Sequence, residues 1–163
     1  MKGKKTDLGR SGCAASRALH VVGDWWSLLI IRDALVGLER FSEFQSSIGL
    51  ARNILATRLK KLVSHQIMVV QADPVRPSVN RYLLTRRGRE LAVVLVALWQ
   101  WGEDNCFDPE ELASDVVDGV NRAIVSKVVL RTESGETIDL DRFQMRLRPR
   151  SPSKSTIDAR VDG

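Results

Sequence analysis

The sequence predicts a mainly α fold with one small β-hairpin, followed by a C-terminal α+β extension. Three observations predict it. Apolar residues recur at helical spacing through most of residues 14–65, two β-prone runs separated by turn residues occupy 67–84, and a long apolar segment follows up to residue 105. With 163 residues, of which 44% are hydrophobic and 28% charged, the chain can bury the core of one domain with an appendage.

Two helices are expected near the N-terminus. The first covers about residues 14–22. The residues before it, 1–12, are rich in lysine and glycine and are expected to be flexible. Asp24 is a good N-cap for the second helix, about residues 25–36, because its carboxylate can accept the unpaired N–H groups of the first turn. Gly37 ends this helix.

A third and a fourth helix are expected on either side of a tight turn at Gly49 and Leu50. The pattern Ser42-x-x-Gln45 predicts a capping box at the start of the third helix. The fourth helix, about residues 51–65, has two chemically different faces. One face carries leucines at positions i, i+4 and i+7: Leu55, Leu59 and Leu62. The opposite face carries polar and basic residues: Asn53, Thr57, Lys60 and Ser64.

A hairpin is expected directly after the fourth helix. Two β-prone runs, residues 67–71 and 79–84, flank a proline-containing turn with Arg76 at its tip. Two helices joined by a short glycine-containing turn form a helix-turn-helix, whose second helix fits the major groove of DNA. With the hairpin as a wing, the predicted fold class is a winged helix-turn-helix with a C-terminal α+β extension.

A long helix, about residues 86–105, is expected after the N-cap Thr85. Its apolar residues cover too much of its circumference for a helix with one buried side. Such a helix is usually buried on more than one side, so we expect a second copy of the chain to cover it.

The sequence changes character after residue 105. Residues 109–120 resemble an acidic helix, and residues 125–130 and 137–140 flank a turn that predicts a second hairpin. The tail is rich in proline, serine and basic residues, which favours disorder. The expected organisation is a flexible N-terminus (1–12), a DNA-binding and dimerisation domain (13–105), an accessory segment (106–147) and a disordered tail (148–163).

Positive charge is concentrated in the predicted motif and hairpin. The whole chain carries +5, but residues 51–89 hold nine Lys or Arg and one acid, Asp73, which gives +8. Residues 102–141 hold three basic and eleven acidic residues, which gives −8. A basic stretch of this kind is the expected footprint of phosphate binding, and the acidic segment could shield it in the free protein. The alternative is a solvated face beside a counter-charged neighbour.

Base recognition is expected from the N-terminal part of the fourth helix. Arginine suits guanine, asparagine suits adenine, and a methyl group can meet thymine. The predicted base contacts are Arg52, Asn53, Ala56 and Thr57. The predicted contacts to the DNA backbone are Ser42, Lys60, Lys61, Arg76 and Arg81. Arg58 lies near the buried edge of the helix and is expected to be a structural ion-pair partner instead.

Several linked motifs resemble the HxlR-type winged helix-turn-helix transcriptional regulators (MarR/HxlR-like). The matching segments are residues 13–35 (CAASRALHVVGDWWSLLIIRDAL), 40–45 (RFSEFQ), 51–62 (ARNILATRLKKL) and 82–91 (YLLTRRGREL). Residues 63–67 depart from the pattern, because the family usually has an acid and a glycine there. The resemblance, over about residues 13–102, implies a homodimeric bacterial repressor or activator that pairs through its first and last helices. The expected interface residues are Leu19, Val22, Leu95, Leu98, Trp99 and Trp101.

The cysteines suggest a sensor. Cys13 precedes a helix N-terminus and lies near Arg10 and Arg17 in the sequence, and both features favour the thiolate. The resemblance also places Cys13 at the position of the family's reactive thiol. The hypothesis is a sensor of oxidants or electrophiles, and the alternative is an inert buried residue at a dimer seam. Cys106 has no such context and is expected to be structural.

Several other classes are disfavoured. Two cysteines and two histidines are too few for a disulfide framework or a His-based metal cluster, so we expect no metal and no cofactor. Apolar runs are too short to span a membrane and none follows the basic N-terminus directly, so we expect a cytoplasmic protein without a signal peptide. A thiol enzyme is disfavoured because no acid partner accompanies Cys13 and His20.

The expected partner is double-stranded DNA with a pseudo-palindromic operator, read by two copies of the fourth helix about 34 Å apart. Two alternatives stay open. The winged helix could be a protein–protein interaction module whose basic face meets an acidic partner. A regulator could also sense a small apolar ligand in a dimer pocket lined by tryptophans, for which the candidates are Trp25, Trp26, Trp99 and Trp101.

Overall fold

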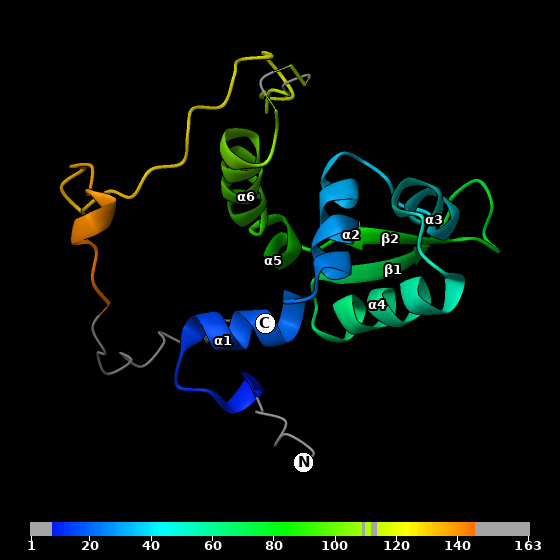
Figure 1. Ribbon diagram of the computed structural model, residues 1–163. Coiled ribbons are helices and arrows are strands. Elements are labelled where there is room, and N and C mark those ends of the chain that lie inside the picture. Colours follow the sequence, from blue (N-terminus) through cyan, green and yellow to red (C-terminus); the bar gives the residue numbers. More distant parts are fainter. Residues whose placement is uncertain (1–7, 109, 112–113, 146–163) are drawn as a thin grey trace, which may run out of the picture. The chain divides into compact units, whose positions relative to one another are not determined.

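The computed structural model describes residues 8–108, 110–111 and 114–145. Its contacts divide the chain into two units, Met1–Val128 and Val129–Gly163. The elements of the first unit are η1 (Leu8–Arg10), α1 (Ala14–Val22), α2 (Trp25–Leu35), α3 (Phe41–Ile48), α4 (Arg52–Ser64), β1 (Met68–Ala72), β2 (Asn80–Leu84), α5 (Arg86–Arg89) and α6 (Ala92–Asn105) (Figure 1). This order confirms a mainly helical winged helix-turn-helix.

The core lies where α2, α3, α4 and the hairpin meet (Figure 1). The leucine face of α4 is buried as predicted, and it packs with side chains from α2, α3 and β1. The fully buried large apolar residues are Ile30, Ile31, Phe44, Leu55, Leu59, Leu62 and Met68. Burying each such side chain contributes about 1.5–3 kcal/mol, so the inner side of α4 is fixed strongly enough to leave its outer side free for contacts.

The N-terminus of α2 is capped as predicted. The Asp24 carboxylate accepts the Ser27 N–H at 2.9 Å and the Ser27 hydroxyl at 2.8 Å. The capping box expected at Ser42 and Gln45 is wrong. The N-cap of α3 is Arg40, two residues earlier than predicted, and the Glu43 carboxylate accepts the N–H groups of the two residues before the helix at 2.9 and 2.8 Å. A carboxylate is a stronger acceptor than an amide, so Glu43 takes this role.

The turn between α4 and β1 contains Gln66 with a φ of 57°. This left-handed conformation favours glycine, and it falls within residues 63–67, where the chain departs from the family pattern. The turn is closed by the Ile67 N–H, which donates to the Leu62 carbonyl at 2.9 Å. A residue other than glycine therefore occupies a strained position in this turn.

The hairpin pairs β1 with β2 in antiparallel register, from Met68 opposite Leu84 to Ala72 opposite Asn80. It confirms the predicted wing. The segment before α3 lies along the outer edge of β2, because the Tyr82 N–H donates to the Glu39 carbonyl at 2.7 Å. A backbone hydrogen bond therefore connects the hairpin to the segment that leads into α3.

The single long helix expected over residues 86–105 is instead two helices, α5 and α6. Thr85 caps α5 as predicted, because its hydroxyl oxygen accepts the Gly88 N–H at 3.0 Å. The chain then tightens, and the Leu91 N–H donates to the Gly88 carbonyl three residues back. Gly88 itself lies against the hairpin, where an added Cβ would stand 2.2 Å from the Ile67 carbonyl oxygen. This close approach turns the chain between the two helices.

The expected acidic helix over residues 109–120 is wrong for the residues that the structure describes. Residues 114–120 are not helical. The Asp118 carboxylate accepts the N–H groups of Val120 and Asn121, which makes a turn at this point. Farther along, Lys127 pairs with Asp104 at 2.6 Å, so the end of the first unit lies beside α6.

The second unit contains a turn rather than a full second hairpin. Arg131 and Thr137 form an isolated antiparallel bridge, and Gly135 adopts a φ of 88° between them. The short helix η2 (Leu140–Arg142) occupies the position where part of the second strand was expected. The predicted tail, 148–163, lies outside the described residues. Within the described residues, no helix is long and apolar enough to cross a lipid bilayer.

Candidate nucleic-acid interface

The outer side of α4 carries the residues that were predicted to contact bases. The leucines on its inner side have exposed fractions of 1% or less. The exposed residues in the first three turns include all four predicted base contacts and one predicted phosphate contact. We call these five the recognition face: Arg52, Asn53, Ala56, Thr57 and Lys60.

Two contacts order the recognition face. The Arg52 guanidinium carbon lies 5.1 Å from the centre of the Phe41 ring, a cation–π contact that joins the start of α4 to the start of α3. The Thr57 hydroxyl donates to the Asn53 carbonyl at 2.9 Å. That bond uses the hydroxyl proton within the helix, so Thr57 is left with acceptor capacity and its methyl group.

Asp24 joins α4 to the start of α2. Its carboxylate lies 3.3 Å from Arg58 Nε and 3.7 Å from Lys61 Nζ. The first pair confirms Arg58 as a structural ion-pair partner. Lys61, which was predicted to contact the DNA backbone, is half-buried beside the same carboxylate. Lys61 therefore has a carboxylate partner within its own chain.

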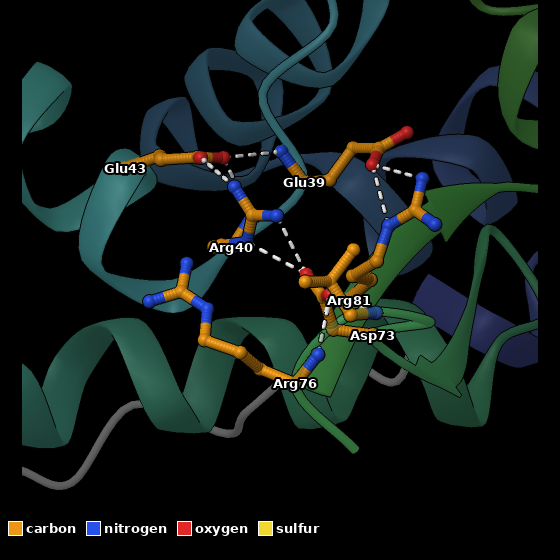
Figure 2. A network of polar contacts seen from close by, with 7 residues as sticks. Glu39, Arg40, Glu43, Asp73, Arg76 and Arg81 are labelled. Atoms are coloured by element: carbon orange, nitrogen blue, oxygen red, sulfur yellow. Dashed lines mark hydrogen bonds and ion pairs between the residues drawn. The ribbon is translucent and has the colours of Figure 1, made fainter. Parts of the chain in front are cut away.

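A network of ion pairs connects the hairpin to the N-terminal end of α3 (Figure 2). Arg40 donates to one oxygen of Asp73 from Nε at 2.9 Å and from Nη2 at 2.6 Å. A third nitrogen of Arg40, Nη1, donates to Glu43 at 3.1 Å. Sequence reasoning missed this network, because only the count of acids in residues 51–89 singled out Asp73 beforehand.

The carboxylates of this network stay charged. Arg40, followed by the backbone N–H groups of Val75 and Arg76, lowers the pKa of Asp73 to about 2. The pKa of Glu43 is also lowered, mainly by the N–H groups of Glu39 and Arg40. Asp73 is only 1% exposed, so the one acid of the basic stretch faces its partners rather than the solvent.

The two predicted arginine contacts of the hairpin have different surroundings. Arg81 Nε donates to Glu39 at 2.6 Å, and Arg81 forms an ion pair with that carboxylate. The positive charge of Arg81 is therefore balanced by Glu39. Arg76 is exposed at the tip, and Figure 2 shows its side chain extending away from Asp73, which accepts its backbone N–H. Ser42 is exposed on α3.

Cys13 is the N-cap residue of α1 and is exposed. The pKa of its thiol is lowered, first by the backbone N–H and the hydroxyl of Ser16 and then by the backbone N–H of Ala15. The lowering therefore comes from groups in the first turn of α1. Arg17 Nε donates to the Ser11 carbonyl instead. Cys106 was expected to be structural, but it too is exposed.

Most of the residues expected at a dimer interface are exposed in the single chain. The exposed fractions are 57% for Leu19, 51% for Leu98, 38% for Trp99 and 59% for Trp101. Leu95 is partly buried against the core of its own chain. Val22 is an exception, because it is 7% exposed and belongs to the core of its own chain.

A cleft of about 480 Å³ lies between α2 and α6. Trp25 and Trp99 line it, together with aliphatic side chains and Arg32, whereas Trp26 and Trp101 are not among its lining residues. Arg32 donates twice to Asp33, at 2.9 and 2.7 Å, so its charge is balanced beside the cleft. The cleft is therefore an apolar site of the size that small ligands occupy.

Residues 21–110 match the family model described as HxlR-like helix-turn-helix. An uncharacterized HTH-type transcriptional regulator of Mycobacterium tuberculosis is 37% identical over 102 residues, which cover 61% of this chain and 63% of that relative. The crystal structure of PA1607, a proposed transcription factor, matches with a TM-score of 0.80 and 41% identity over 86% of this chain and 99% of that one. The redox regulator HypR in its oxidized form matches with a TM-score of 0.52 and 27% identity over 57% of this chain and 97% of that one.

Proposed function

This chain belongs to the HxlR-like helix-turn-helix family, and we propose that it is a dimeric transcriptional regulator that binds a pseudo-palindromic DNA operator. The observation that carries this proposal is the two-sided α4, with leucines buried on one side and the recognition face exposed on the other. A helix of this kind matches the width of the major groove. The mycobacterial relative, which is called an HTH-type transcriptional regulator, supports the proposal.

The proposed roles follow from position and chemistry. Arg52, Asn53, Ala56 and Thr57 read base edges from the first turns of α4. Lys60 and Ser42 contact phosphates, and Arg76 contacts the backbone or the minor groove from the wing. Lys61 and Arg81 contribute less to backbone binding than the sequence suggested, because both side chains form ion pairs with carboxylates of the chain.

Two substitutions on the recognition face test this proposal. Lys60→Ala is expected to weaken binding to all sequences and to reduce the slope of log affinity against log salt by about one unit. Asn53→Ala is expected to relax sequence preference, at a cost of about 1–3 kcal/mol on the preferred site. The preferred site would first be obtained by selecting bound duplexes from a random pool. An unchanged preference in Asn53→Ala would refute the assignment of base contacts.

A protein–protein interaction module is the rival explanation for the basic face. Salt-dependent retention of the full chain on a palindromic duplex separates the two explanations. A regulator is retained at low salt and released as the salt concentration rises, because cations return to the phosphates. Absence of retention on any selected duplex would favour a protein partner.

Regulation through Cys13 is part of the proposal. The exposed thiol with a lowered pKa supports it, as does the similarity to the redox regulator HypR. A thiolate-rich cysteine should react with a thiol reagent faster than free cysteine at neutral pH. In Cys13→Ser, DNA affinity should persist while its response to oxidants or electrophiles disappears. A reaction rate equal to that of free cysteine, with an unchanged response in Cys13→Ser, would refute a sensing role.

The cleft between α2 and α6 favours a second candidate, the sensing of a small apolar effector. Its volume of about 480 Å³ suits a ligand of modest size. Fluorescence of Trp25 and Trp99 would report binding in a screen of apolar compounds. Val96→Phe, which places a ring at the lining of the cleft, should abolish such a signal, and Val120→Phe on the accessory segment is the matched control.

A further inference from the structure

The wing tip, residues 73–78, is tied to the N-terminal end of α3 through one buried carboxylate. One oxygen of Asp73 accepts both Nε and Nη2 of Arg40, at 2.9 and 2.6 Å (Figure 2). The other oxygen accepts the backbone N–H groups of Val75 and Arg76, at 2.9 and 3.1 Å. The side chain of Arg40 and the backbone at Arg76 are therefore held by the same group.

The far end of this connection is equally fixed. Arg40 occupies the N-cap position of α3, and its Nη1 donates to Glu43 at 3.1 Å. Glu43 in turn accepts the N–H groups of Glu39 and Arg40. The same carboxylate therefore caps the N-terminus of α3 and orients the guanidinium of Arg40. Arg40 thus bridges two carboxylates, and its charge is neutralised before any DNA arrives.

The wing tip needs such a connection. The strand ladder ends at Ala72 and Asn80. Beyond it, the Asp73 N–H donates to the Val79 carbonyl and the Val79 N–H to the Arg76 carbonyl, each at 2.8 Å. These bonds close the loop on itself but do not join it to the helix-turn-helix. The bond between Arg40 and Asp73 makes that connection, across 33 positions of sequence.

We propose that Arg40 and Asp73 are positioning residues for DNA binding, which hold the wing tip so that Arg76 and the recognition face of α4 reach the same duplex. This inference rests on the proposed function. A tip fixed in advance binds without an additional cost of ordering at the moment of association. Neither side chain needs to touch DNA, because Arg40 is neutralised by carboxylates and Asp73 is buried.

Charge and position predict opposite results for Asp73→Asn. If only charge matters, removing an acid from the basic stretch strengthens DNA binding. If Asp73 positions the tip, binding weakens, because an asparagine amide has a single acceptor oxygen and cannot accept both the guanidinium and the backbone N–H groups of Val75 and Arg76. Arg40→Gln should weaken binding in the same way. Both variants should lose about one unit of salt slope, the value of one phosphate contact, as Arg76→Ala does.

A double-mutant cycle separates positioning from direct contact. In the Arg76→Ala background, Arg40→Gln should lower affinity by no more than about twofold further, because the contact that it supports is already gone. Lys127→Gln is the matched control, since it removes one positive charge and one ion pair beside α6. Additive losses, with about two units of salt slope, would mean that Arg40 contacts a phosphate itself and would overturn the inference.

Hydrogen exchange in the free protein provides an independent measurement. The amides of Val75 and Arg76 should exchange about tenfold faster or more in Arg40→Gln and in Asp73→Asn, while the amide of Leu59 in α4 keeps its protection. Unchanged exchange at the wing tip, or tighter DNA binding by Asp73→Asn, would overturn the inference. If the parent chain binds no duplex, the proposed function fails, and the exchange rates still decide whether the pair orders the tip.

Discussion

Gln66 shows how a single residue can store strain at the entrance of the wing. Its φ of 57° costs a residue with a side chain about 1–2 kcal/mol, whereas glycine carries an entropy cost of about 0.5–1 kcal/mol. Gln66→Gly should therefore raise the free energy of unfolding by about 0.5–1 kcal/mol, measured by urea denaturation.

Ser64→Gly is the control for Gln66→Gly. Ser64 is the last residue of α4, and its exposed hydroxyl donates to the Lys61 carbonyl at 2.8 Å. Glycine there adds flexibility and removes this exposed bond, so the variant should lose about 0.5–1 kcal/mol. A loss in Gln66→Gly as large as that in Ser64→Gly would contradict the left-handed conformation of Gln66.

Asp73 gives the site a defined response to acid. Its folded pKa of about 2 lies below the ordinary value of 3.8, first because of Arg40 and then because of the N–H groups of Val75 and Arg76. A lowered pKa means that its stabilising contribution is complete above pH 3.8 and is lost as the pH falls through about 2. Arg40→Gln should raise the pKa of Asp73 toward 3.8, measured by carboxyl carbon NMR. Titration of Asp73 near 3.8 in the parent chain would contradict the bond.

At the scale of elements, the sequence predicted what is decided within one or two turns. Asp24 and Thr85 cap helices as expected, because a cap and the N–H that it accepts are three residues apart. The leucine face of α4 was also predicted, because burial follows helical periodicity. The Arg40–Asp73 bond joins residues 33 positions apart, so no local sequence pattern predicts it. The acidic helix failed for a different, local reason, since the Asp118 carboxylate accepts the N–H groups of Val120 and Asn121 and forms a turn there.

The break between α5 and α6 depends on Gly88. A Cβ at this position would lie 2.2 Å from the Ile67 carbonyl oxygen and 3.0 Å from a Leu84 methyl carbon. The carbonyl belongs to backbone and cannot turn aside, so Gly88→Ala should cost about 2–4 kcal/mol of unfolding free energy, measured by thermal and urea denaturation.

Gly102→Ala is the control for Gly88→Ala. Gly102 lies inside α6, and an added Cβ there has no heavy atom within 4 Å. Alanine at this position should therefore stabilise the chain by about 0.5–1 kcal/mol through its helix propensity. Equal effects of the two substitutions would contradict the packing of α5 against the hairpin.

At the scale of the whole molecule, the composition of the candidate site was predictable but the state of each charge was not. Periodicity assigned Arg52, Asn53 and Lys60 to the outer face of α4, because helical spacing can be determined from the local sequence alone. The sequence could not show that Lys61 faces Asp24, because that carboxylate belongs to another helix. Nor could the sequence show that Val22 is buried within its own chain, since whether a chain or its partner covers an apolar residue depends on packing at a distance.

The exposed apolar side of α6 leads to the last prediction, which concerns assembly. Leu98 and Trp101 are 51% and 59% exposed, and a two-fold interface would bury each of them twice. Trp101→Glu should therefore weaken dimerisation by about 3 kcal/mol or more, measured by sedimentation over a range of concentrations. DNA affinity should fall in parallel, because two half-sites are then bound by separate chains. Val120→Glu places the same charge on an exposed apolar residue of the accessory segment and should leave dimerisation unchanged. A monomeric parent chain, or equal effects of the two variants, would show that this side of α6 has another use.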